Sequence, residues 1–194
     1  MVIRLLAFLF IIGCSPEAES QGRYSVVNVF ASKPPPNPGK TYGTGFYVER
    51  NIILTAYHIL SGRDRTKDIV IVGYGNKPVK AELIKIDKAK DLALLRIKGN
   101  GESPFRLCDA YTIGDSVYLL SRKDNKYMKR RGKIKYIFPQ FVISDIPTQK
   151  GLSGSPVIKR QFLQKCVVGM HRLSKSRHVP AWVIKRFLKK ALHK

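Results

Sequence analysis

The sequence predicts an all-β protein with a single α-helix at its C-terminal end. Short apolar runs rich in β-branched residues, such as Ile69-Val70-Ile71-Val72, alternate with turns along most of the chain. None of these runs has a helical period before the last segment. Many short strands without interleaved helices favour a β-barrel or a β-sandwich. The length of 194 residues fits one compact domain or two small subdomains that share a core.

The expected elements follow one another closely along the chain. A first strand is expected at 24–31, followed by a proline-rich surface loop at 34–39 that cannot form a ladder. Further strands are expected at 45–48, 52–55, 68–74, 78–86, 92–97, 116–120, 132–138, 141–144, 156–158 and 166–170. The segment 180–192 is predicted to be an amphipathic helix, because its apolar residues recur at helical spacing: Ile184, Phe187, Leu188 and Ala191.

Residues 1–20 predict an export signal and the start of a tether. Arg4 precedes an apolar run at 5–12 that is too short to span a bilayer and right for a signal-peptide core. The following Ile11-Ile12-Gly13-Cys14 resembles a bacterial lipobox, in which Cys14 becomes the acylated first residue. An ordinary signal sequence with an incidental cysteine is the alternative. The expected location is therefore outside the cytoplasm, as a membrane-anchored lipoprotein or as a periplasmic or extracellular protein.

The stretch 149–156 has the composition of a nucleophile loop. Gly151 and Gly154 bracket Ser153, and Pro156 closes the turn before an apolar pair. Glycine allows backbone conformations that other residues avoid and leaves room for a substrate carbonyl. The amides of Gly151 and Ser153 are the expected oxyanion donors. By itself the pattern is also that of an ordinary glycine-serine turn.

Two upstream segments supply partners for this serine. His58 comes just after the apolar run 52–55, and Asp91 opens the apolar run 92–97. A single histidine or aspartate at a strand end is usually structural, but here the order is His, Asp, Ser. The chain thus contains a candidate nucleophile, a candidate base and a candidate acid that could orient the base.

These segments together resemble the chymotrypsin-like (trypsin-like) serine peptidases over about residues 24–192. The matching signatures are Thr-Ala-x-His, Asp-hydrophobic-Ala-Leu and Gly-x-Ser-Gly-x-Pro. The resemblance implies two six-stranded antiparallel β-barrels, one at 21–103 and one at 104–194 that also carries the helix. It also implies an acyl-enzyme mechanism with Ser153 as nucleophile, His58 as base and Asp91 as its orienting partner, and without a metal or organic cofactor.

The motifs are most similar to those of bacterial glutamyl endopeptidases and Deg-type periplasmic peptidases. Thr148 lies five residues before Ser153, and His171 lies two residues after a strand glycine, as in the glutamyl enzymes. Picornavirus-type proteases that cut after glutamine are similar too. A hydroxyl and an imidazole can bind a carboxylate or an amide, so cleavage after Glu or Gln is expected. The alternative is that His171 is a satisfied core histidine.

One position departs from the family pattern, and two cysteines leave their pairing open. Leu152 stands where relatives mostly carry aspartate or asparagine, which in zymogen-type relatives pairs with a freed N-terminus. Activity without N-terminal cleavage is therefore expected, and the support of the oxyanion loop is left open. Cys108 and Cys166 could pair in an oxidising compartment, but free buried thiols are the favoured expectation.

The charge is strongly positive, with 36 Lys and Arg against 13 Asp and Glu and a net charge of +23. A dense basic tract at 122–135 is expected to rim the substrate cleft or to form a solvated loop. Such a surface attracts anionic partners, including acidic substrates and phospholipid. Little aromatic interleaving argues against base stacking, so no specific nucleic acid is predicted. The alternative function is a catalytically weak, protease-like module that docks on anionic surfaces.

Overall fold

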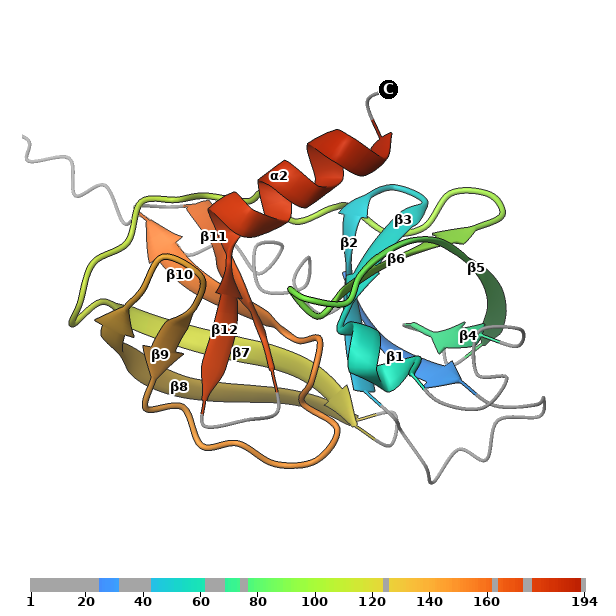
Figure 1. Ribbon diagram of the computed structural model, residues 1–194. Helices are drawn as coiled ribbons and strands as arrows, with labels where there is room; N and C mark the ends of the chain where they lie inside the picture. Colours follow the sequence, from blue (N-terminus) through green and yellow to red (C-terminus); the bar gives the residue numbers. More distant parts are fainter. Residues whose placement is uncertain are drawn as a thin grey trace, which may run out of the picture.

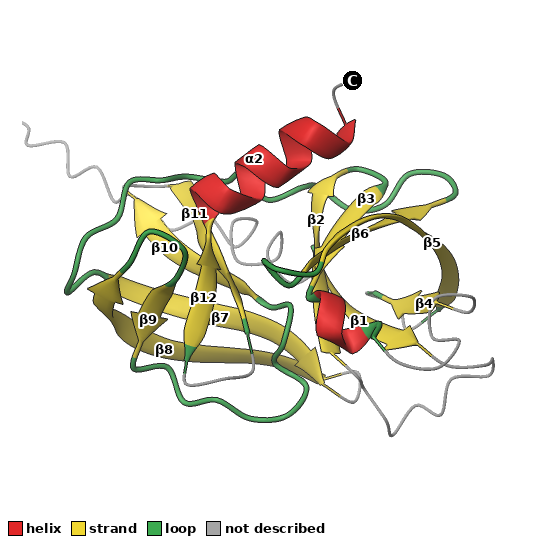
Figure 2. Ribbon diagram, viewed as in Figure 1, coloured by secondary structure: helices red, strands yellow, loops and turns green. Residues whose placement is uncertain are grey.

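The computed structural model describes residues 25–31, 43–61, 69–73, 77–123, 126–161, 164–172 and 176–192. In these ranges the chain forms two closed β-barrels, one after the other in sequence, and one C-terminal α-helix (Figure 1). Nearly all the regular structure is strand (Figure 2). The prediction of two six-stranded antiparallel barrels is confirmed. The expected export signal with Cys14 and the proline-rich loop lie outside the described residues.

The N-terminal barrel is built from the apolar runs of the first half of the chain. Its strand order is β1-β2-β3-β6-β5-β4, and β4 pairs with β1 to close it. Leu54, Leu94 and Leu95 are fully buried in its core. The strands are β1 (Val26–Ala31), β2 (Gly43–Glu49), β3 (Ile52–Thr55), β4 (Ile69–Val72), β5 (Pro78–Asp87) and β6 (Leu92–Ile97).

The C-terminal barrel has the order β10-β11-β12-β9-β8-β7, and β10 pairs with β7 to close it. Leu119, Leu152 and Val157 are among the residues of its buried cluster. Its strands are β7 (Ser116–Lys123), β8 (Lys126–Ile137), β9 (Val142–Ser144), β10 (Pro156–Gln161), β11 (Gln164–His171) and β12 (Arg177–Pro180). Strand β12 was not predicted, because it is only four residues long and runs directly into the helix.

The basic tract forms a strand hairpin rather than a loop. Strand β8 begins at Lys126, before the expected start at 132, and its residues from Lys126 to Lys133 pair with β7. Lys129, Arg131 and Lys133 alternate with less exposed positions, as expected for one outward face of a strand. The expectation of a solvated tract is wrong for Arg122, which is buried. This burial lowers the pKa of its guanidinium.

Helix α2 (Ala181–Leu192) lies across the top of both barrels (Figure 1). Ile184 and Phe187 are buried in the larger core cluster, as the apolar face predicted. Trp182 stacks on Tyr111 of the connection between the barrels, with ring centroids 5.9 Å apart. Among the described residues, no helix is long and apolar enough to cross a bilayer.

Cys108 and Cys166 form a disulfide, so the expectation of free thiols was wrong. Their Cα atoms are 5.8 Å apart, within the range that a disulfide needs. The Cys108 N–H donates to the Val167 carbonyl at 3.0 Å, which aligns the inter-barrel connection beside β11. This long-range register brings the two sulfurs together, and sequence spacing alone does not reveal it.

Candidate active site

The pairing of β3 with β6 brings His58 and Asp91 together. Thr55 near the end of β3 lies opposite Ala93 near the start of β6, so the residues just beyond these ends are neighbours. His58 Nδ1 donates to Asp91 Oδ2 at 2.8 Å, and the His58 backbone N–H donates to Asp91 Oδ1, also at 2.8 Å. These two bonds fix both the position and the ring orientation of His58. They also require that Nδ1 carries the proton, which leaves Nε2 as an acceptor.

A third donor also contacts Asp91. Arg172 Nε–H donates to Asp91 Oδ2 at 3.1 Å, the same oxygen that His58 Nδ1 contacts. Burial by itself would raise the pKa of the Asp91 carboxyl. The hydrogen bonds from His58 and the charges of His58 and Arg172 outweigh burial and hold this pKa below its ordinary value. Arg172 was not predicted, because only the tertiary structure places the end of β11 beside β6.

Ser153 lies on a tight loop between β9 and β10. Its carbonyl accepts from the Thr44 N–H at 2.8 Å, and the Gly154 N–H donates to the His171 carbonyl at 2.9 Å. Gly154 has φ +83°, and a Cβ at this position would collide with the Thr44 carbonyl oxygen. The glycine after the serine is thus required by the contact between the loop and strand β2.

Gly43 links the serine loop to the histidine turn. A Cβ at position 43 would collide with the Ile59 side chain and lie 3.1 Å from the Ser153 carbonyl oxygen. Ile59, the residue after His58, and the backbone of Ser153 therefore both pack against Gly43, where there is no room for a side chain. In the described part of the chain, Ser153 Oγ and His58 Nε2 share no hydrogen bond; such bonds are often long before substrate binds.

The backbone around Ser153 leaves two amides unused. Neither the Gly151 N–H nor the Ser153 N–H donates to a described residue, whereas the Leu152 N–H donates to the Gln149 carbonyl at 3.3 Å. Gly151 has φ +93°, and its carbonyl accepts from the Thr44 hydroxyl at 3.0 Å. Alternate amides of the turn are thus free to bind an anion.

Leu152 holds this turn against the C-terminal barrel. Its side chain is fully buried in the cluster that contains Val157 and Val168. The departure from the family pattern at this position is therefore a packing contact.

His171 lies in a buried chain of polar groups. Its Nδ1 is 3.3 Å from His178 Nδ1, and His178 Nε2 is 2.7 Å from Ser144 Oγ. Burial and then the charge of His58 lower the pKa of His171 to about 4. Burial and then His171 lower the pKa of His178 well below its ordinary value. Both rings are therefore neutral at neutral pH.

The second nitrogen of His171 has no hydrogen-bond partner in the part of the chain that the structure describes. His171 Nε2 is buried and forms no hydrogen bond to a described residue. Thr148, its expected companion, is exposed and shares no hydrogen bond with His171 in the described part of the chain. The expectation of a satisfied core histidine therefore describes only Nδ1. His178, which lies opposite His171 in register, could have been found only by predicting β12.

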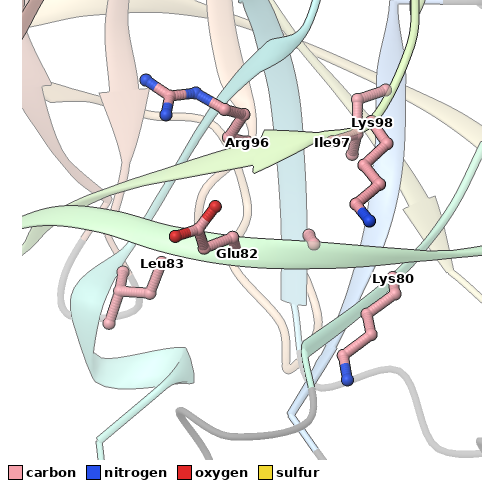
Figure 3. A pocket seen from close by; sticks show the side chains of 7 residues that line it. Lys80, Glu82, Leu83, Arg96, Ile97 and Lys98 are labelled. Atoms are coloured by element: carbon pink, nitrogen blue, oxygen red, sulfur yellow. The ribbon is translucent and has the colours of Figure 1, made fainter.

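A hollow on the outside of the N-terminal barrel lacks the groups that this chemistry needs. It has a volume of about 690 Å³ and lies over β5 and β6 (Figure 3). Its polar side chains are Lys80, Glu82, Arg96 and Lys98, with no serine or histidine among the described residues that line it. The combination of His58, Asp91 and the serine loop therefore remains the candidate site.

The comparisons with known proteins agree with this architecture. The family model described as trypsin-like peptidase domain matches residues 43–170, which include all three of these positions. The solved structure titled "Crystal structure of Deg5" superimposes with a TM-score of 0.74 and 16% sequence identity. The match covers 91% of this chain and 93% of that one. Among curated proteins no sequence matches.

Proposed function

Because the chain belongs to the family of trypsin-like peptidases, and is therefore a serine endopeptidase, we propose that Ser153, His58 and Asp91 are its catalytic triad. The observation that carries this proposal is the pair of bonds from His58 to Asp91. They set the tautomer in which His58 Nε2 is free to accept a proton. The close approach of Gly43 to Ile59 and to the Ser153 carbonyl brings the serine loop next to the histidine turn. This supports Ser153 as the residue that gives its proton to His58.

The proposed reaction follows from these positions. Ser153 Oγ attacks the scissile carbonyl while His58 Nε2 takes its proton, and Asp91 stabilises the imidazolium that forms. The Gly151 and Ser153 amides bind the oxyanion, each contributing about 3 kcal/mol. The imidazolium then passes its proton to the leaving amine, and an acyl-enzyme remains. Water attacks this ester by the same steps, which releases the acid and restores Ser153.

A fluorophosphonate probe tests the proposed nucleophile. It should label the protein covalently and stoichiometrically, and the labelling should disappear in Ser153→Ala. Ser155→Ala is the matched control, because Ser155 lies on the same loop and should keep its labelling. A well-folded protein that takes up no probe, or a Ser153→Ala variant that still reacts, would refute the assignment.

We further propose that the P1 side chain, on the acyl side of the cut bond, is Glu or Gln and is bound by Thr148 and His171. The polar chain behind His171 supports this. Ser144 Oγ already accepts from the Ile146 N–H at 3.2 Å, so its own proton is available for His178 Nε2. His178 Nδ1 then donates to His171 Nδ1, and His171 Nε2 keeps a proton. A neutral N–H donor suits a carboxylate or an amide oxygen and repels a lysine ammonium.

Cleavage of a peptide library tests this specificity. Glu and Gln should dominate at P1, and His171→Ala should reduce kcat/KM for such peptides by about 10- to 100-fold, the effect of losing a buried donor. If that variant folds poorly, Ser144→Ala keeps His171 and should weaken the same preference. A preference for Lys, Arg or large apolar P1 residues, or an unchanged profile in His171→Ala, contradicts the proposal.

We also propose that the protein is exported and held at an anionic membrane surface. The disulfide supports an oxidising compartment. The apolar run before Cys14 supports a lipid anchor. A hollow of about 720 Å³ lined by Lys129, Arg131 and Lys133 supplies a cationic face for phospholipid.

Two signals of this kind together bind a membrane more stably than either does alone. Metabolic palmitate labelling should track the protein and vanish in Cys14→Ser. The unlipidated variant should still bind anionic vesicles at low salt. A mature protein without lipid that begins well beyond residue 14 would refute the anchor.

A further inference from the structure

A cavity of about 400 Å³ lies beside Asp91 and is separate from the proposed P1 site. Lys90, next to Asp91, forms part of its wall, and Arg172 forms another part. The connection between β8 and β9 contributes Phe141, and helix α2 contributes Trp182 and Arg186. The N-terminal barrel, the C-terminal barrel and the helix that lies across them all contribute to this cavity. Arg172, which donates to Asp91, is therefore shared between this cavity and the candidate active site.

The cavity is lined by cations and by no described carboxylate. Lys90, Arg172 and Arg186 are its charged residues. Lys90 is paired with Asp87 at 2.7 Å, outside the lining. Arg186 forms no ion pair with a described residue. The unbalanced charge of Arg186 favours an anion in this cavity.

Arg172 can contact a ligand without leaving Asp91. Its Nε–H is bonded to Asp91 Oδ2, and its side chain is 35% exposed. The two terminal nitrogens of the guanidinium have no hydrogen-bond partner among the described residues. Because the guanidinium is a rigid planar fork with five donors, its terminal groups remain available while Nε stays on Asp91.

The aromatic residues add selectivity for a carboxylate on a short apolar stem. Phe141 and Trp182 form apolar walls against which methylene groups can pack. We propose that this cavity is a substrate subsite for an acidic side chain on the acyl side of the cut bond. In it Arg172 joins the substrate carboxylate to Asp91. This inference rests on the proposed function, because it needs a polypeptide bound across His58 and Ser153.

The subsite is connected to the catalytic machinery through one oxygen atom. Asp91 Oδ2 accepts from both His58 Nδ1 and Arg172 Nε. A substrate carboxylate bound to Arg172 therefore changes the electrostatic environment of His58. Arg172 is thus a positioning residue. Among the described residues, Lys90 and Arg186 line the cavity with Arg172, the charge of His58 acts on His171, and Tyr57 is bonded to the Asp91 carbonyl through its backbone. A role of this kind affects the pH profile as well as the affinity.

Matched peptides test the subsite at constant ionic strength. Peptides that differ only by Glu or Gln at P2, P3 or P4 should show one position at which Glu raises kcat/KM about 3- to 10-fold, the effect of a partly exposed ion pair. Arg186→Gln should remove most of this preference, so that the Glu and Gln peptides are cleaved with similar kcat/KM. Arg96→Gln, on the outer face of the N-terminal barrel, is the matched control and should keep the preference.

Arg172→Gln separates the charge of this residue from its hydrogen bond. It should abolish the Glu preference and move the acidic limb of the kcat/KM profile to higher pH, because a cation beside the His58–Asp91 pair is lost. A purely structural role would lower kcat/KM equally at every pH.

Two results would overturn the inference. One is an equal kcat/KM for Glu and Gln peptides at all three positions. The other is an Arg186→Gln variant that affects both peptides equally. Fluorophosphonate labelling of the same preparation separates the two proposals. Labelled Ser153 without a Glu preference refutes only the subsite, whereas an unlabelled, folded protein refutes the proposed function itself.

Discussion

Replacement of Asp91 by asparagine is expected to lower kcat by about ten thousandfold. An asparagine would turn its NH₂ group or its oxygen toward His58 Nδ1, and it would no longer stabilise a positive ring. The proton is then easily placed on Nε2, where it blocks the proton transfer from Ser153. The aspartate in this chain accepts three hydrogen bonds, from the His58 backbone, the His58 ring and Arg172. The neutral side chain would also leave Arg172 without its carboxylate.

Measurement of kcat with a saturating peptide, together with urea unfolding, would separate chemistry from stability. Asp109→Asn is a suitable control, since Asp109 pairs with Lys185 at 2.7 Å on the exposed side of α2. That variant should keep its kcat and unfold as the parent does. An Asp91→Asn protein with kcat within tenfold of the parent would show that Asp91 does not orient the base.

Replacement of Leu152 by aspartate is expected to lower the free energy of unfolding by about 4 kcal/mol or more. Leu152 is fully buried among Ile146, Val157 and Val168. A carboxylate there would lose its hydration, and this apolar cluster offers it no counter-charge. Since small domains are stable by only about 5–15 kcal/mol, much of the protein should unfold or lose the order of its oxyanion loop.

Urea unfolding followed by fluorescence measures this effect, and fluorophosphonate labelling reports the state of the loop. Leu152→Met is the control and should cost less than about 1.5 kcal/mol, because it conserves volume and apolarity. An aspartate variant as stable and as reactive as the parent would mean that the loop is held in place by other contacts.

Local patterns were enough to predict an all-β chain and to single out the three candidate catalytic positions, and the resemblance to a known family narrowed the fold to two barrels. The β-branched runs define the strands, and both His58 and Asp91 lie at strand ends, where an antiparallel register places them together. The glycines on either side of Ser153 predict an unusual backbone conformation there, even when the residues packed against this loop are unknown. These features depend on residues within a few positions of one another, which is the range over which sequence patterns carry information.

The other features depend on contacts between distant segments. The disulfide requires the parallel bridge of Leu107 with Val167, and the histidine chain requires the unpredicted strand β12. Arg172 contacts Asp91 only because the end of one barrel faces the other. The burial of Arg122 likewise follows from tertiary packing, although its neighbours in the sequence form an exposed basic face. None of these pairings has a signature in the sequence around the residue concerned.

The buried position of Leu152 bears on two possible roles of the segment before β1, which are activation by cleavage and attachment to a membrane or a partner. We propose that a loop held by its own leucine needs no ion pair from the chain end, so that an anchor, a linker or a fused partner placed before β1 would leave the chemistry unaffected. We expect such a peptidase to be competent as soon as its barrels have packed. Its activity would then be controlled by where the protein is placed and which chains reach it, rather than by an activating cut.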